Sequence, residues 1–278
     1  MIISSECITS RQNPLVKWVC SLQDKKGREA ASSFMAEGLK LTLEAAASRL
    51  EVTHIFLMES RAEQYLAQLT ERFSADLYEK TLLVVLADDV FAKISTEKAP
   101  QGVISVIKYL DFFDELDIIY NVDFKFPIHH RVLALSSVRD PQNLGSVIRS
   151  AVAFGTEHIL LSDDCADVYN PKTVRAAMGS LFRVRITRAK VLCSLLLALK
   201  DSGRRILAAE LRDNARSLTE MELMPSDVVV VGNEGHGIDP AISEMATHSV
   251  YIPISNKTES LNAAVAAALF MWEQAKHV

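Results

Sequence analysis

From residue 131 onward, short apolar runs rich in Val, Ile and Leu alternate with longer segments of helical periodicity. The expected strands cover residues 132–138, 158–162, 182–186, 205–211, 228–232 and 250–254, and the expected helices cover 144–154, 171–179, 190–202, 238–246 and 260–275. Such alternation is typical of an α/β domain with a mainly parallel sheet and helices on both faces. Ligands bind at the carboxyl ends of the strands in these sheets, so the loops that follow the strands are the candidate functional segments.

The first part of the chain shows a shorter alternation of the same kind. "NPLVKWVCSL" and "EGLKLTLEAAA" have helical patterns, and "VTHIFLM", "LLVVLA" and "QGVISVI" are β-rich runs. A chain of 278 residues is long enough for two domains. We therefore expect a small α/β domain over residues 1–109, a linker over 110–130 that contains Pro127, and a second domain over 131–278.

The net charge of −5 argues against indiscriminate binding of polyanions. Charge is unevenly distributed: residues 172–190 hold six Lys or Arg and no acid, whereas residues 111–123 hold five acids and no base. Such a basic run is most often a solvated surface, but near a catalytic site it favours contact with RNA. In the first domain the candidates for contacts with phosphate are Arg11, Lys17, Lys25, Lys26, Arg28 and Lys40.

The four cysteines lie far apart, and none belongs to a Cys-x-x-Cys pair. This spacing predicts free thiols, with neither a disulfide framework nor a zinc site. The N-terminal segment lacks the charged start and apolar run of a signal peptide, and no stretch approaches the roughly 18 apolar residues of a membrane span. We therefore expect a cytoplasmic protein that holds no metal and does not enter a membrane.

The segment "DPQNLGSVIRSAVAFG", residues 140–155, combines an apolar helical pattern with polar groups. Asn143 is the expected N-cap of the helix, since its amide oxygen can accept a backbone N–H. One apolar stripe is formed by Leu144, Val147, Ile148, Ala151 and Val152. Arg149 lies off that stripe, on a face whose small neighbours leave room for a ligand to reach the guanidinium.

The segment "VVVVGNEGHGID", residues 228–239, leads from an expected buried strand into a loop with three glycines. These glycines favour backbone amides that are open to a ligand. Their order differs from the dinucleotide-binding fingerprint, which argues against a dehydrogenase, and no Walker A loop is present. His236 has no evident carboxylate or nucleophile partner, so we expect a loop residue rather than a proton shuttle.

The segment "YIPISNKTESLNAAVAAALFMWE", residues 251–273, passes from a strand through a polar loop into an alanine-rich helix. Ser260 is the expected N-cap of that helix, and Asn262 lies in its first turn. The expected packing stripe consists of Leu261, Val265, Ala268 and Trp272.

Together, "NLGSVIR", "GNEGHGI" and "IPI…SLNAAVAAAL" resemble, in order and spacing, the three motifs of the SpoU-type (TrmH) RNA 2′-O-ribose methyltransferases of the SPOUT superfamily. "VRAAMGSLFRV", residues 174–184, matches a stretch between the first two motifs. In the first domain, "NPLVK", "FMAEGLKLTLEA" and "KAPQGVISV" resemble the substrate-binding region that many members carry. The resemblance implies an enzyme that transfers a methyl group from S-adenosylmethionine to a ribose 2′-hydroxyl of ribosomal or transfer RNA.

The resemblance also implies a fold, an assembly and a set of site residues. Its C-terminal part would form a deep trefoil knot, and the protein would be a homodimer built around the site. The implied cofactor-binding residues are Gly232, Asn233, Glu234, Gly235, Gly237, Ile252, Pro253, Ile254 and Leu261. The implied catalytic residues are Asn143, Arg149, Glu234, Ser260 and Asn262.

We interpret Arg149 as the group that holds the target phosphate and stabilises the developing alkoxide, because a guanidinium side chain stays protonated in proteins and is therefore ill suited to act as a base. Asn143 and Asn262 would orient the nucleophile and the loops. Two positions depart from the family pattern: Asn256 stands near a usual glycine, and Ala177 where a serine is common. The alternative is an RNA-binding or ribosome-assembly protein of this fold with weak or lost methyltransferase activity.

Overall fold

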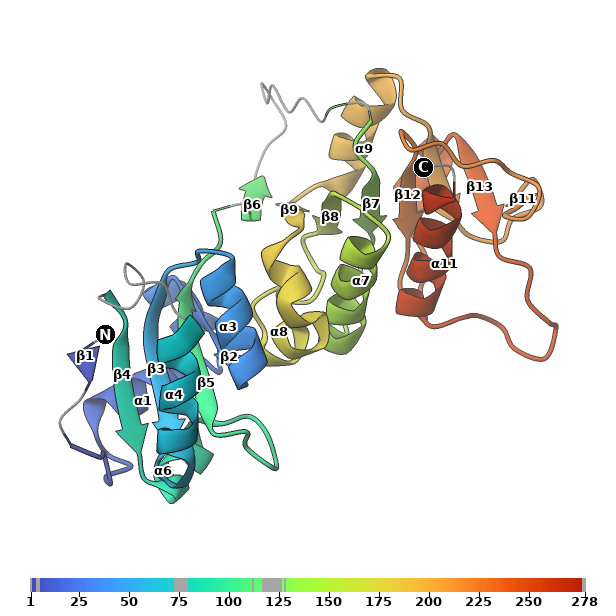
Figure 1. Ribbon diagram of the computed structural model, residues 1–278. Helices are drawn as coiled ribbons and strands as arrows, with labels where there is room; N and C mark the ends of the chain where they lie inside the picture. Colours follow the sequence, from blue (N-terminus) through green and yellow to red (C-terminus); the bar gives the residue numbers. More distant parts are fainter. Residues whose placement is uncertain are drawn as a thin grey trace. The chain divides into compact units, whose positions relative to one another are not determined.

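A computed structural model describes residues 2–3, 6–72, 80–111, 113–116, 127 and 129–276 of the chain (Figure 1). By their internal contacts the residues divide into two units. Unit 1 comprises residues 1–110 and 167–182, and unit 2 comprises residues 111–166 and 183–278. Much of the predicted linker, residues 112, 117–126 and 128, lies outside the described residues.

Unit 2 is built on a parallel sheet of eight strands in the order β11-β13-β10-β12-β7-β8-β9-β6. The strands are β6 (Phe113–Leu116), β7 (Val132–Leu135), β8 (His158–Ser162), β9 (Arg185–Ala189), β10 (Ile206–Ala209), β11 (Arg216–Ser217), β12 (Val228–Val231) and β13 (His248–Tyr251). All of the strand pairs in this sheet are parallel. The predicted parallel α/β domain is confirmed, whereas the trefoil knot stays a prediction.

Helices cover both faces of this sheet, as the alternating sequence predicts. The helices of unit 2 are α7 (Pro141–Ala153), α9 (Leu192–Asp201), α10 (Pro240–Met245) and α11 (Ala263–Ala275). Side chains of α9 and α10 pack with Val132, Ala134, Val228 and Val230 in one core cluster. On the other face α7 and α11 lie side by side (Figure 1). This pairing brings two segments together that are more than a hundred residues apart in sequence.

Both predicted N-caps are wrong, because an earlier or a later residue satisfies the helix start. Helix α7 begins at Pro141 with Asp140 as its N-cap, and the Asp140 carboxylate accepts the Gln142 N–H at 2.7 Å. A proline at the first helical position favours this start. Helix α11 begins at Ala263, and its N-cap is Asn262, which accepts the N–H groups of residues 264 and 265 at 3.0 and 3.3 Å. Asn143 and Ser260 are thereby not needed as caps.

The predicted packing stripe of α11 is also wrong. Its buried face consists of Ala263, Ala264, Ala267, Phe270, Met271 and Gln274. Val265 and Trp272, which we expected in the core, are 49% and 50% exposed. The helix is apolar nearly all round, so the period of its sequence alone could not select the buried side.

Unit 1 has a five-stranded sheet in the order β1-β4-β3-β5-β2. Its strands are β1 (Ile2–Ile3), β2 (Ser33–Glu37), β3 (Val52–Met58), β4 (Leu82–Leu86) and β5 (Val103–Lys108). Its helices are α1 (Pro14–Ser21), α2 (Lys25–Ala31), α3 (Leu39–Ala47), α4 (Ala62–Arg72), α6 (Asp88–Ile94) and α8 (Pro171–Ala177). Two 3₁₀ turns, η1 (Glu59–Arg61) and η2 (Met178–Phe182), complete the unit. Helices α1 and α6 share a core cluster with the sheet. The small α/β character expected of this region is confirmed, although β2 was not predicted.

The segment of residues 167–182 belongs to unit 1 although both of its chain neighbours belong to unit 2. Tyr169 is 2% exposed, stacks on Tyr109 and Phe34 with ring centroids 4.2 and 4.7 Å away, and accepts the Leu110 N–H at 3.0 Å. The Arg28 guanidinium donates to the Asp167 carboxylate at 2.5 Å. The predicted limits of the two domains, which place this segment in 131–278, remain a proposal.

Arg28 lies in the interior of unit 1, so its predicted contact with phosphate is wrong. Its side chain is 2% exposed and also donates to the carbonyl oxygens of Leu22 and Gln23 at 2.9 and 2.7 Å. Among the other candidates, Arg11, Lys25 and Lys40 pair with neighbouring carboxylates at the surface. A long cation can be buried in this way because one carboxylate and two backbone carbonyls accept hydrogen bonds from it.

Replacing Arg28 with Met is expected to reduce the free energy of unfolding by about 3–5 kcal/mol, because Asp167 loses its cation in a largely buried setting. Urea denaturation measures the effect, and Lys26→Met serves as the control at an exposed position of the same helix. A loss below about 1 kcal/mol in Arg28→Met would show that the pair is no stronger than a surface ion pair.

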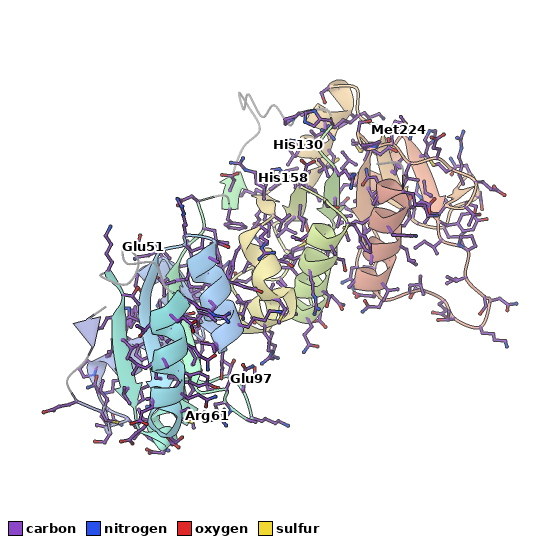
Figure 2. All side chains as sticks on the ribbon, viewed as in Figure 1. Glu51, Arg61, Glu97, His130, His158 and Met224 are labelled. Carbon is purple, nitrogen blue, oxygen red and sulfur yellow. The ribbon has the colours of Figure 1, made fainter. Side chains whose placement is uncertain are left out.

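His158 is a buried titratable group of unit 2 (Figure 2). Desolvation, followed by the charges of Arg185, His130 and Arg204, lowers its pKa to about 3. Between pH values of about 6.5 and about 3, the unfolded chain therefore binds a proton that the folded protein does not. Stability is lost as the pH falls through this window, by at most about 1.4 kcal/mol per pH unit from this site.

The variant His158→Gln is expected to flatten the decline in unfolding free energy between pH 7 and 4, because it removes this titration. Urea denaturation across that range measures the slope, with His236→Gln, which removes an exposed imidazole, as the control. Equal slopes in wild type and His158→Gln would contradict the assignment.

Candidate active site

Three polar side chains from distant segments of unit 2 meet in one hydrogen-bonded cluster. The Asn143 amide, in the first turn of α7, donates to Glu234 Oε1. Asn262, the N-cap of α11, donates through Nδ2 to Asn143 Oδ1 at 2.9 Å. Glu234 Oε1 also accepts the Ala263 N–H at 3.3 Å. We name these three residues, Asn143, Glu234 and Asn262, the polar cluster.

The loop that carries Glu234 is shaped by its neighbour Asn233. The Asn233 side chain accepts the N–H groups of Gly235 and His236 at 2.8 and 3.2 Å, and it donates to the Ser137 carbonyl at 3.0 Å. Its backbone pairs with that of Gly237 through two hydrogen bonds of 3.0 and 2.9 Å. The loop after β12 is therefore fixed both internally and to the end of β7.

A short chain of hydrogen bonds extends this support. The Ser137 N–H donates to Ser162 Oγ at 2.8 Å, and Ser162 Oγ donates to the Asp164 carboxylate at 2.7 Å. Burial acts to raise the pKa of Asp164, but hydrogen bonds from Ser162, Arg139 and Ser137 outweigh it and lower the pKa to about 2. Asp164 is therefore an anion at neutral pH and a constant acceptor for Ser162.

Gly232 and Gly237 lie so close together that a side chain at residue 232 would have no room. A Cβ atom on Gly232 would collide with the Gly237 carbonyl group and would lie 2.6 Å from the Ile238 nitrogen. Gly237 has a φ of +71°, in the left-handed region that favours glycine. These two positions explain why a glycine-rich sequence is needed for this turn.

Beside the polar cluster, unit 2 has a cavity of about 740 Å³. Its wall is contributed by the carboxyl ends of β10, β12 and β13, by the polar loop before α11, and by α11 itself. The lining residues are Ala209, Glu210, Leu211, Val231, Gly232, Asn233, Glu234, Gly237, Val250, Tyr251, Ile252, Pro253, Ile254, Ser255, Asn256, Thr258, Glu259, Ser260, Leu261, Ala263, Ala266 and Phe270. Among these described lining residues none is Lys, Arg or His, and three are Glu.

The structure brings most of the predicted site residues to this cavity. Of the predicted cofactor-binding residues, all but Gly235 line it. Ser260 lines it as well, and its carbonyl accepts the Thr258 hydroxyl at 3.2 Å. Asn256 also lines it and has no positive φ, so the glycine expected there is not required for the backbone conformation seen.

Two predicted catalytic residues, Ser260 and Arg149, do not join the polar cluster, and Arg149 does not line the cavity either. Its side chain is exposed, and it makes no hydrogen bond or ion pair with another described residue. Leu144, Val147, Ile148 and Ala151 on the same helix are buried, as predicted. The guanidinium is thus free for an external anion.

Three wall residues, Ala209, Glu210 and Leu211, were not predicted. Ala209 is the last residue of β10 and the other two follow it, and β10 lies between β12 and β13 in the sheet. The sequence predicted a strand over residues 205–211. It did not predict that this strand would lie between β12 and β13. Phe270 was assigned to no site because it lies in the middle of an apolar helix.

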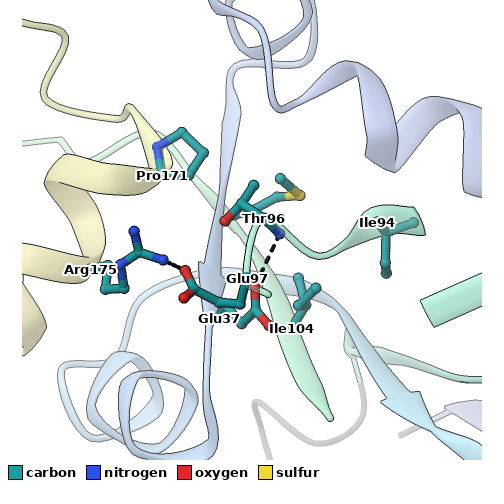
Figure 3. A pocket seen from close by; sticks show the side chains of 8 residues that line it. Glu37, Ile94, Thr96, Glu97, Ile104, Pro171 and Arg175 are labelled. Atoms are coloured by element: carbon teal, nitrogen blue, oxygen red, sulfur yellow. Dashed lines mark hydrogen bonds and ion pairs between the residues drawn. The ribbon is translucent and has the colours of Figure 1, made fainter. Parts of the chain in front are cut away.

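Unit 1 has a much smaller pocket, of about 20 Å³, lined in part by Glu37, Glu97 and Arg175 (Figure 3). Arg175 pairs with Glu97, and Glu37 accepts the Ser95 hydroxyl at 2.7 Å. These polar groups satisfy one another in a space of water size, so the pocket is no candidate for a substrate site.

Within the described residues, no group of three His, Cys, Asp or Glu side chains could hold a metal ion. Cys7, Cys20, Cys165 and Cys193 are free. No helix in the described part of the chain is both long enough and apolar enough to span a bilayer.

Comparison with known proteins agrees with this geometry. Residues 130–272 match the SpoU rRNA Methylase family, and residues 13–105 match the MRM3-like substrate binding domain. A relative from Bacillus subtilis, the 23S rRNA (guanosine(2553)-2′-O)-methyltransferase RlmP, is 31% identical over 265 residues, which is 95% of this chain and 97% of that protein. A 23S rRNA (uridine(2479)-2′-O)-methyltransferase from Streptomyces viridochromogenes is 26% identical, covering 96% and 90% of the two chains.

The fold has a close match among solved structures. The AdoMet-bound rRNA methyltransferase from Sinorhizobium meliloti is 28% identical, with a TM-score of 0.79, over 99% of this chain and 98% of that one. Since the matched region covers more than half of the chain and contains the whole cavity, the chain belongs to the SpoU rRNA methylase family.

Proposed function

We propose that this protein transfers a methyl group from S-adenosylmethionine to a ribose 2′-hydroxyl of RNA. The observation that carries the proposal is the meeting of Asn143, Glu234 and Asn262 beside a cavity built by the ends of three strands. Similarity to rRNA 2′-O-methyltransferases over nearly the full length of both chains supports it.

The residues of the cavity fit S-adenosylmethionine in their chemistry. Apolar side chains, among them Val231, Ile252 and Leu261, suit a purine ring. The absence of cations from the described lining and the presence of three Glu suit a ligand with a sulfonium and an ammonium group. When bound, the cofactor supplies an electrophilic methyl group.

We assign the roles of the polar residues from their contacts. Asn143 and Asn262 hold each other and Glu234, so their amides are fixed before a substrate arrives. Such fixed geometry lowers the barrier of a displacement reaction, by roughly 7–11 kcal/mol in ideal cases. Arg149 would bind the phosphate next to the target ribose with two parallel hydrogen bonds from its planar guanidinium. Ser260 would contact the nucleophile from the polar loop before α11.

We further propose ribosomal RNA as the substrate class, with unit 1 as its binding unit. The named activity of the Bacillus subtilis relative and the match of residues 13–105 to a substrate binding domain support this choice. Lys17, Lys26 and Lys172 are exposed in unit 1 and form no ion pair with another described residue, and they remain candidates for phosphate contacts. Transfer RNA is the other substrate class, and the cytoplasm is the proposed location.

A homodimer is also part of the proposal. Val265, Leu269 and Trp272 on α11 are 49%, 38% and 50% exposed, and together they form an apolar stripe at helical spacing. Exposed apolar stripes of this kind support association. Light scattering of the purified chain tests the assembly, since a monomer at micromolar concentration would contradict it.

The experiment for the activity is methyl transfer in vitro from S-adenosylmethionine with a labelled methyl group to total cellular RNA. After digestion to nucleosides, the label is expected in a 2′-O-methylnucleoside from large ribosomal RNA. Label in a methylated base would contradict the reaction, and label only in transfer RNA would contradict the substrate class. Binding of RNA without transfer would favour the alternative of an RNA-binding or assembly protein, against which the intact polar cluster argues.

A further inference from the structure

Glu210 is an acidic residue of the cavity wall that the polar cluster does not use. It follows β10 directly, and its backbone N–H donates to the Val250 carbonyl of β13 at 3.0 Å. Glu210 lines the cavity, and its side chain is 17% exposed. None of the three sequence motifs includes it.

The carboxylate of Glu210 is held by three donors. Ser243 Oγ donates to Oε2 at 2.7 Å, Ser249 Oγ donates to Oε1 at 2.8 Å, and Arg212 Nε lies 3.1 Å from Oε1. Both serines are buried, at 6% and 8% exposure. A carboxylate has about four acceptor sites, so Oε2 keeps one for a further donor, and the three contacts set the orientation of the group in advance.

The position of Glu210 in the sheet separates it from the reacting atoms. In the strand order β13-β10-β12-β7, Glu234 follows β12 and Asn143 lies in the helix after β7. Neighbouring strands are about 4.8 Å apart, which puts the end of β10 roughly 10 Å from the end of β7. A ligand group that meets Glu210 would therefore lie apart from the polar cluster.

We infer that Glu210 is a specificity-determining residue that accepts a hydrogen bond from the adenosyl part of the cofactor. The inference rests on the proposed function. A carboxylate only accepts, and a hydrogen bond to it is stronger than one between neutral groups. The adenosyl group offers neutral donors of two kinds, the ribose hydroxyls and the purine amino group. Beside Glu210, Leu211, Val250 and Ile252 give the apolar surface that the rings require.

The test measures binding of S-adenosylhomocysteine and of three analogues by calorimetry. The analogues lack the 2′-hydroxyl, the 3′-hydroxyl or the purine 6-amino group. Each ligand is titrated into wild type, Glu210→Ala and Glu210→Gln, with Glu244→Ala as a control that removes an exposed carboxylate from α10. The glutamine variant keeps the size of the side chain and serves if the alanine variant fails to fold.

One analogue is expected to bind wild type about tenfold more weakly than the parent compound, and this difference should fall below about twofold in the Glu210 variants. The identity of that analogue distinguishes a sugar contact from a base contact. If the variants weaken all four ligands by the same factor, or none, the inference is overturned and Glu210 only supports the wall. If wild type binds none of the four ligands, the proposed function itself fails.

Discussion

Replacing Arg149 with Ala is expected to reduce kcat for RNA methylation by about 10²–10³-fold, the cost typical of losing one group that stabilises transition-state charge. The binding of S-adenosylmethionine should change little, because Arg149 is exposed on α7 and does not line the cavity. Steady-state methyl transfer and calorimetry on the same preparations measure the two quantities. Arg216→Ala, at an exposed site of unit 2, is the control for loss of a surface cation.

The variant Arg149→Lys distinguishes bidentate hydrogen bonding to phosphate from attraction by the positive charge alone. Lysine keeps the charge but lacks the planar guanidinium that donates two parallel hydrogen bonds to phosphate oxygens. Most of the reduction in kcat expected for Arg149→Ala should therefore persist in Arg149→Lys. Turnover near that of wild type in Arg149→Lys would remove the case for bidentate recognition. A pH profile unchanged between wild type and the lysine variant would further exclude Arg149 as the proton acceptor, since the two side chains differ in basicity.

Replacing Gly232 with Ala is expected to weaken S-adenosylmethionine binding by more than about a hundredfold. The added Cβ would collide with the Gly237 carbonyl group, which is backbone and is tied to Asn233 by two hydrogen bonds. The turn must open, and the loop that carries Glu234 moves with it. Overpacking of this kind destabilises the native turn by about 1–3 kcal/mol. The displaced cavity wall would also lose contacts with the cofactor.

Gly235→Ala is the matched comparison, because its Cβ would meet only Asn233 Oδ1, at an ordinary 3.5 Å. We expect a much smaller loss of affinity in this variant. Calorimetry measures both affinities, and circular dichroism checks that both variants fold. Equal losses in the two variants would show that the collision at Gly232 is not what the glycine-rich loop avoids.

The alternation of strands and helices could be predicted from the sequence because buried parallel strands are continuous apolar runs. The strands at residues 158–162 and 228–231 fell where the pattern placed them. The beginnings of helices were harder, since Asp140 and Asn143 are both good N-caps and only Pro141 favours the first. The buried face of α11 was missed because nearly every residue of that helix is apolar.

The site residues that belong to sequence motifs could be predicted. The residues that reach the cavity only because of the order of strands in the sheet could not. The motifs pointed to Asn143, Glu234 and Asn262, and the structure joins these residues by hydrogen bonds. Glu210 could not be predicted, because its place in the wall depends on β10 lying between β12 and β13. Arg28 was misjudged because a sequence does not reveal that Asp167, 139 residues away, meets it in the interior.

The central claim is that the segments after β10, β12 and β13 form one cofactor site. A crystal structure with S-adenosylhomocysteine bound tests this claim most directly. The ligand should lie in the cavity and touch the segments after β10, β12 and β13, with its sulfur on the side of Glu234 and Asn143. Density for the ligand outside this cavity, or contacts with only one of the three segments, would contradict the shared site.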